Sequence, residues 1–121
     1  MAEMNPRITV EYDDSATIVT LLDEKILEER DVRQLESSLI SLIEEAKGLS
    51  LVLDFSNVKF MSSAVLGLLI KVSKRVYEHQ GKLALCAISP KIYEIFKITR
   101  LTKIFDIYPD VQDAVTGLSE Q

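Results

Sequence analysis

Two short, almost uninterrupted apolar segments constrain the fold of this chain more than any other feature of its sequence. Residues 49–55 (LSLVLDF) and 82–87 (KLALCA) have the composition of central strands that are buried on both faces. Between them, residues 63–79 repeat apolar side chains at helical spacing. Neighbouring parallel strands need a long crossover connection, which is usually a helix. The three segments therefore predict a β-α-β unit at the centre of an α/β sheet.

The residues before this unit predict a hairpin followed by an amphipathic helix. Residues 8–12 alternate apolar and polar side chains, residues 13–15 (DDS) interrupt the pattern, and residues 16–22 resume as a β-rich run. Residues 29–46 then place apolar side chains on one helical face, and Gly48 follows as a stop. We expect two paired strands and a helix packed against the sheet.

The last third of the chain continues the alternation of helices and strands. Residues 89–98 begin with Ser-Pro, which is typical of a helix start, residues 103–107 predict a short strand, and residues 109–118 a terminal helix. No repeat or linker interrupts the chain, so we expect one domain over residues 1–121 with a core at about 7–118. The predicted fold class is α/β, with a mixed β-sheet, an N-terminal hairpin and about four helices.

Composition excludes several classes of function. With 121 residues, 47% of them hydrophobic, the chain is long and apolar enough to bury its own core. It lacks the roughly 20-residue apolar run of a membrane span and the features of a signal peptide, which predicts a cytoplasmic protein without membrane insertion. The single Cys86 and the single His79 favour neither a disulfide, a metal site nor a Ser/His hydrolase. We expect no metal, no cofactor and no enzymatic activity.

The formal net charge of -5 is unevenly distributed along the chain. Residues 1–57 carry 13 acidic and 5 basic side chains, whereas residues 58–121 carry 6 acidic and 9 basic ones. Neither half has the strongly basic tract that nucleic-acid binding requires, so no nucleic-acid partner is expected. The asymmetry fits either a solvated acidic half or a polarised surface that steers a protein partner.

The most informative loop spans residues 54–67, from the end of a central strand into a helix, where open α/β sheets place functional residues. Ser62 and Ser63 fall at the predicted helix start, so either hydroxyl could cap the helix. Alternatively, one of them is a phosphoacceptor, because free amides and the helix dipole stabilise a phosphate at this position.

A helical wheel of residues 64–79 separates two faces. One stripe holds Ala64, Gly67, Lys71, Lys74, Arg75 and Glu78, and the apolar residues from Val65 to Tyr77 fill the rest. Two small residues beside the serines would let a partner's backbone approach, and the basic residues follow on the same face. An ordinary solvated face is the alternative. The candidate partner-binding residues are Ser62, Ser63, Ala64, Gly67, Lys71, Lys74 and Arg75.

Residues 51–72 (LVLDFSNVKFMSSAVLGLLIKV) and 81–108 resemble the STAS domain of anti-sigma factor antagonists, and the resemblance covers essentially the whole chain after residue 7. The family pattern at the strand-helix junction is Asp-Ser-Ala-Gly-Leu-Gly, and its phosphorylated serine corresponds to Ser63. Ala64, Leu66 and Gly67 also match. Two positions depart from the pattern, because Ser62 replaces the aspartate and Val65 the first glycine. Ser62 is therefore a second candidate acceptor.

The resemblance implies a binding switch that has a protein partner. An unmodified antagonist docks on a serine kinase that doubles as an anti-sigma factor, so that the sigma factor is released, and phosphorylation by the kinase ends the docking. A first alternative is a STAS scaffold or transporter-associated subunit that binds a protein without being phosphorylated. The sequence leaves the oligomeric state open.

A remote alternative is a phosphoaspartate receiver, because the chain has an acidic pair at Asp13 and Asp14, Asp54 at a strand end, and Lys103. In a receiver the acidic pair ends a buried parallel strand and leads into a helix, whereas here it separates two predicted strands. We therefore expect nearby backbone amides to bind the Asp54 carboxylate.

Overall fold

The predicted hairpin forms at one edge of the sheet. β1 (Ile8–Tyr12) pairs antiparallel with β2 (Thr17–Leu21), and Ile8 lies opposite Leu21. The computed structural model describes residues 7–13 and 16–120, so the predicted turn residues Asp14 and Ser15 lie outside the described part. Alternating apolar side chains thus place one face of the hairpin toward the core, as the sequence pattern indicates.

Three further strands extend the sheet in parallel from β2. They are β4 (Ser50–Asp54), β6 (Lys82–Cys86) and β7 (Ile107–Tyr108), and the strand order is β1-β2-β4-β6-β7. The apolar centre of β4 is completely buried, as expected of a central strand covered on both faces. The carboxyl ends of β2, β4 and β6 therefore meet at one edge, where the loops to the next helices begin.

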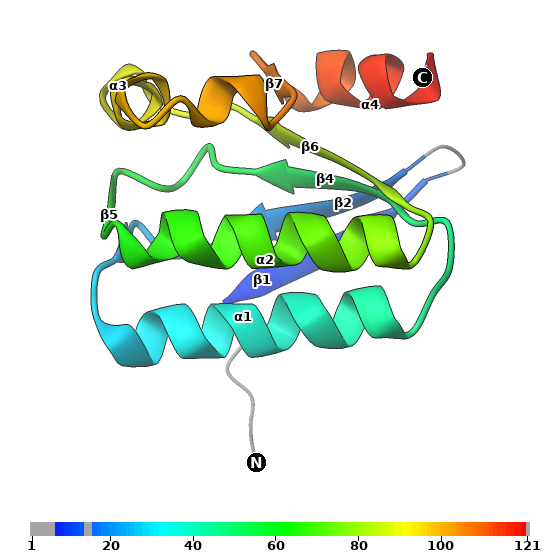
Figure 1. Cartoon of the computed structure of the whole chain (residues 1–121), viewed down its shortest axis with the longest axis horizontal. Helices are drawn as coiled ribbons and strands as arrows, with labels where there is room; N and C mark the ends of the chain where they lie inside the picture. Colours follow the sequence, from blue (N-terminus) through cyan, green and yellow to red (C-terminus); the bar gives the residue numbers. More distant parts are fainter. Residues whose placement is uncertain (1–6, 14–15, 121) are drawn as a thin grey trace.

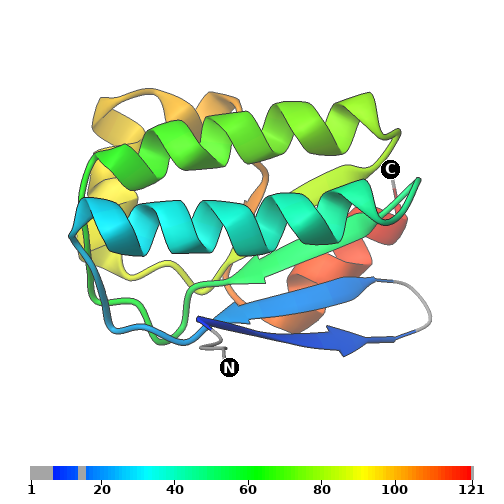
Figure 2. The same ribbon diagram turned by 90° about the horizontal axis from the view of Figure 1, so that it is seen from below.

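Helices cover both faces of this sheet and confirm the predicted α/β class. α1 (Glu29–Glu44) and α2 (Ala64–Glu78) lie side by side on one face, and α4 (Val111–Ser119) covers the other (Figures 1 and 2). α3 (Pro90–Ile98) lies at the end of the molecule where α2 begins (Figure 1). No helix in the described part is both long and apolar enough to cross a membrane.

Local signals set most helix boundaries. The Ser89 hydroxyl accepts a hydrogen bond from the Ile92 amide at 3.3 Å, which caps α3 as its Ser-Pro start predicts. Gly48 has a φ of +69°, consistent with the predicted stop after α1. After α2, Gln80 takes the positive φ, at +65°.

The strand that the sequence predicts near the C-terminus is shorter in the structure and begins later. Residues 103–106 do not form a strand, because the chain turns at Arg100, with a φ of +64°, into the 3-10 helix η1 (Leu101–Lys103). Phe105 then packs edge-on against Phe96 at a ring separation of 6.1 Å, which leaves only the two residues of β7 to pair with β6.

A second, two-stranded sheet was not predicted. β3 (Lys25–Ile26) pairs in parallel with β5 (Phe60–Met61), inside the loop that connects β4 to α2. The Ser62 amide donates a further hydrogen bond to the Ile26 carbonyl at 3.0 Å. This small sheet fixes the approach of the chain to the start of α2.

Candidate functional site

Ser63 occupies the N-cap position of α2 and is exposed. Its backbone is already helical, with φ -63° and ψ -20°, and its side chain makes no capping hydrogen bond. The prediction that a serine hydroxyl caps this helix is therefore wrong for Ser63. The Val65 and Leu66 amides instead donate to the carbonyls of Ser62 and Ser63, in a tight first turn. The Ser63 hydroxyl is left exposed to solvent and without a capping role.

The neighbouring Ser62 has a different environment. Its hydroxyl oxygen is buried and has no hydrogen-bond partner among the described residues. A buried hydroxyl without a partner stabilises nothing, so Ser62 does not act as a cap either. Although the sequence makes both serines candidate phosphoacceptors, only Ser63 presents an accessible hydroxyl in this conformation.

The outward stripe of α2 lies where the helical wheel predicts it. Ala64, Gly67, Lys71 and Lys74 are exposed, and a Cβ atom added to Gly67 would meet no described residue within 4 Å beyond its chain neighbours and the backbone of its own helix. Val65 is completely buried, so the departure from the family glycine at this position is a packing change. The helical wheel predicts Tyr77 on the inward face of α2, but this residue is 63% exposed. The predicted apolar face is therefore wrong at this position.

The basic part of the stripe is already engaged by the neighbouring helix. Lys71 Nζ lies 2.8 Å from Glu36 Oε2, and Arg75 pairs with Glu44, so both cations meet acidic side chains of α1. Among the described residues, Lys74 has no carboxylate within ion-pair distance. The stripe is therefore less cationic than its sequence indicates, and α1 belongs to the same surface.

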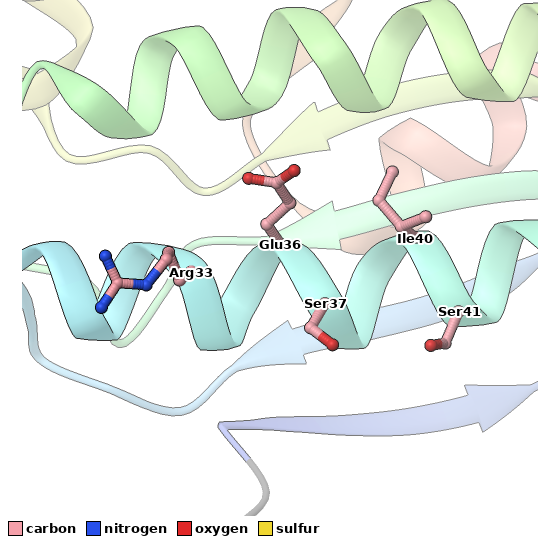
Figure 3. A pocket seen from close by; sticks show the side chains of 5 residues that line it. All are labelled: Arg33, Glu36, Ser37, Ile40 and Ser41. Atoms are coloured by element: carbon pink, nitrogen blue, oxygen red, sulfur yellow. The ribbon is translucent and has the colours of Figure 1, made fainter.

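The α1 side of this surface is slightly hollowed. Within the described part of the chain, a shallow depression of about 330 Å³ is lined by five residues of α1, namely Arg33, Glu36, Ser37, Ile40 and Ser41 (Figure 3). Glu36 and Ile40 point toward α2 in this view, whereas Ser37 and Ser41 lie on the far side of α1. Its wide opening leaves a ligand exposed to water, unlike the concave sites that usually hold small molecules.

The residues that suggested a receiver are kept apart. Thr17 pairs with Leu51 and Thr20 with Asp54, so Asp13, which precedes β2, lies beyond the opposite end of β4 from Asp54. Asp54 Oδ1 accepts a hydrogen bond from the Ser56 amide at 2.9 Å, as predicted. Lys103 belongs to η1, and Asp14 lies outside the described part. The described geometry does not assemble the receiver constellation.

An apolar pocket beside β5 was missed by the sequence prediction. It has a volume of about 190 Å³ and is lined by Leu27, Phe60, Met61, Ile92 and Ile95, with Lys59 and Lys91 in its wall. We call it the Phe60 pocket. Its residues come from three separate segments, and the sequence offers only one signal, the adjacent apolar pair Phe60 and Met61 in a loop.

Comparison with known proteins identifies similar chains. The sequence model of the STAS domain matches residues 8–114. The anti-sigma F factor antagonist of Paenibacillus polymyxa is 27% identical over 115 residues, which are 95% of this chain and 97% of that protein. An anti-sigma factor antagonist (STAS) domain protein from Planctomyces limnophilus is 25% identical, with a TM-score of 0.83 over 93% of this chain and 97% of that one. Unphosphorylated SpoIIAA, an anti-sigma factor antagonist, shares the fold at 16% identity, with a TM-score of 0.77 over 94% and 97% of the two chains.

Proposed function

Because the chain belongs to the STAS domain family, we propose that it is an anti-sigma factor antagonist that works as a phosphorylation-switched protein-binding module. The family is non-enzymatic, so its members act by binding. In the proposed cycle, the unphosphorylated chain docks on a serine kinase that doubles as an anti-sigma factor, and the sigma factor is freed. Phosphorylation of Ser63 by this kinase then ends the docking.

The accessibility of Ser63 carries this proposal. Its exposed hydroxyl lies next to two exposed small residues, Ala64 and Gly67, and open space surrounds Gly67. A kinase can bring its own backbone close to a surface that lacks bulky side chains. Ser62, in contrast, offers a hydroxyl that is buried. The proposed acceptor is therefore Ser63, with the surface from Ser62 to Arg75 as the proposed docking site.

Electrostatics explain how a phosphate could switch docking off. Phosphorylation adds about two negative charges, and the first turn of α2 contains no acidic residue that would repel them. The free protein therefore tolerates the phosphate at the positive end of the helix dipole. In a desolvated interface, unpaired charges cost several kcal/mol, and a loss of about 3 kcal/mol lowers affinity by more than about 100-fold. SpoIIAA, whose fold this chain shares, has also been solved in a phosphorylated form.

Labelling by a kinase tests the acceptor. The protein is incubated with ATP and the purified anti-sigma factor kinase of the same organism, and the site is mapped by fragmentation mass spectrometry. We expect phosphate on Ser63, its loss in Ser63→Ala, and full labelling of the control Ser62→Ala, since removing an unpartnered hydroxyl disturbs little. Phosphate on Ser62 alone would refute the assignment, and tight binding without any transfer would favour the unphosphorylated scaffold alternative.

A charge at Gly67 tests the docking surface. Gly67→Glu places a carboxylate on the exposed stripe, and its burial without a partner should cost about 2 kcal/mol of binding, or roughly 30-fold in Kd. Gln112→Glu adds the same charge at an exposed position of α4 and serves as the control. Calorimetry with the kinase measures both. Equal affinities, with intact circular dichroism spectra, would place the interface elsewhere.

A further inference from the structure

The Phe60 pocket exposes large apolar side chains that the proposed switch does not use. Leu27 is 50% exposed, Phe60 44% and Ile95 36%, and all three line the same hollow. Isolated apolar side chains are common on protein surfaces, but a group of them around a concavity is typical of an interaction site. The side chains come from the β3–α1 connection, β5 and α3, which are separate in sequence.

The size of the pocket limits what can enter it. An apolar cavity of roughly 150 Å³ is large enough to hold a benzene ring. The Phe60 pocket, at about 190 Å³, therefore has room for one aromatic or branched aliphatic side chain. An apolar group larger than one such side chain would not fit inside the pocket.

Lysines surround the Phe60 ring and define the charge of an occupant. Lys25 Nζ lies 5.9 Å and Lys91 Nζ 5.8 Å from the ring centre, within cation-π distance. Neither lysine has a carboxylate within ion-pair distance in the described part of the chain, whereas Lys59 lies 3.6 Å from Glu24. Lys91 in the pocket wall and Lys25 beside the Phe60 ring therefore offer two cations to acidic groups that would flank an inserted apolar side chain.

The pocket is continuous with the proposed docking surface. Met61 lines it and lies only two residues before Ser63, and the β3–β5 pairing holds this segment in place. A partner that reaches Ser63 can therefore contact both regions.

We propose that the Phe60 pocket binds one apolar side chain, phenylalanine or leucine, of a partner protein segment in which acidic residues flank that side chain. The apolar group fills the pocket, and the flanking carboxylates pair with Lys25 and Lys91. The identity of the partner as the kinase rests on the proposed function, whereas the chemistry of the segment rests on the pocket alone.

A peptide titration tests the pocket without the kinase. The ¹⁵N-labelled full chain is titrated with a blocked synthetic peptide, Glu-Asp-Phe-Glu-Asp, and amide shifts are followed by NMR. We expect saturable shifts centred on Leu27, Phe60 and Ile95, and at least about 10-fold weaker binding when alanine replaces the peptide phenylalanine. Lys91→Glu should weaken binding similarly, whereas the control Lys47→Glu, an exposed charge outside the pocket, should not.

Three results of the titration would overturn the inference. The first is the absence of saturable shifts around the pocket at millimolar peptide. The second is equal weakening by Lys91→Glu and Lys47→Glu, which indicates unspecific charge attraction. The third is the appearance of the same shifts on concentrating the protein alone, which assigns the pocket to a second copy of the chain.

A second experiment separates the pocket from the switch. Phe60→Ala should lower kinase affinity by at least about 10-fold, while Tyr12→Ala, which removes a 72% exposed aromatic ring from β1, should leave it unchanged. If both variants bind and are labelled like the parent, the pocket inference fails and the proposed function stands. If the kinase neither binds nor labels the parent, the proposed function fails, and the peptide titration still decides the pocket.

Discussion

At the scale of single residues, a glycine within α2 and another just after it have opposite requirements. A Cβ atom at Gly81 would lie 2.5 Å from the Leu49 carbonyl oxygen, so only glycine fits without a shift of the backbone. Gly67 is an exposed residue within the helix, and its added Cβ would have no described residue within 4 Å beyond its chain neighbours and its own helix backbone. Gly67 therefore lowers the stability of the helix without any packing benefit, which is consistent with a role in docking.

Alanine substitutions should separate these two roles. We expect Gly81→Ala to lower the free energy of unfolding by about 1–3 kcal/mol, because the neighbouring backbone must move. Gly67→Ala should raise it by up to about 1 kcal/mol, because alanine favours the helix. Urea denaturation of both variants measures the difference. A Gly67→Ala variant as unstable as Gly81→Ala would show that the space around Gly67 is not open.

At the scale of secondary-structure elements, acidic side chains of α1 pair with two of the basic side chains on α2. Lys71 and Arg75 are paired with Glu36 and Glu44 across the two helices, so an acidic partner competes with α1 for these cations. The side chains of both pairs are between 31% and 57% exposed, and surface pairs of this kind contribute less than about 1 kcal/mol each to stability. Breaking both pairs on docking therefore costs less free energy than a specific interface contributes.

Neutralising the carboxylates of α1 should strengthen docking. We expect the double variant Glu36→Gln/Glu44→Gln to bind the kinase more tightly at low salt, with a change in unfolding free energy below about 1 kcal/mol. Glu29→Gln is the control, because Glu29 pairs with Arg33 within α1. Titrations at low and high salt compare the three proteins. Weaker binding of the double variant would mean that the partner contacts these carboxylates directly.

At the scale of the whole molecule, α4 closes the second face of the sheet over a small core that contains Cys86, Ala114 and Leu118. Burial, together with the charges of Asp54 and Asp110, raises the pKa of the Cys86 thiol to about 12. The folded state therefore holds the thiol protonated at a pH where the unfolded chain, with an ordinary pKa of 9.0, releases its proton. This contribution to stability is complete below pH 9 and is lost as the pH rises toward 12.

Two measurements on Cys86 follow from its burial. The native thiol should react with a disulfide reagent at pH 8 only as fast as the protein opens, and denaturant should accelerate the reaction. Between pH 7 and pH 10.5, the stability of the parent relative to Cys86→Ala should fall by about 1–2 kcal/mol. The comparison cancels the titration of other groups. Rapid native labelling, or a difference independent of pH, would contradict the closed position of α4.

Much of the architecture was predictable from the sequence because it depends on local periodicity. The hairpin, the buried strands β4 and β6, the helices and the Ser89 cap all follow from spacing within a few residues. The STAS resemblance of the strand-helix junction is likewise a property of adjacent residues, and the family match confirms it.

Tertiary structure decided the features that join distant segments. The β3–β5 pair links residues 35 positions apart with only two residues in each strand, too few for a periodic signal. The choice between Ser62 and Ser63, the ion pairs of Lys71 and Arg75, and the Phe60 pocket depend in the same way on which side chains the fold brings together. Local sequence sets which residues favour a helix or a strand, but burial and pairing are set by neighbours that only the folded chain supplies.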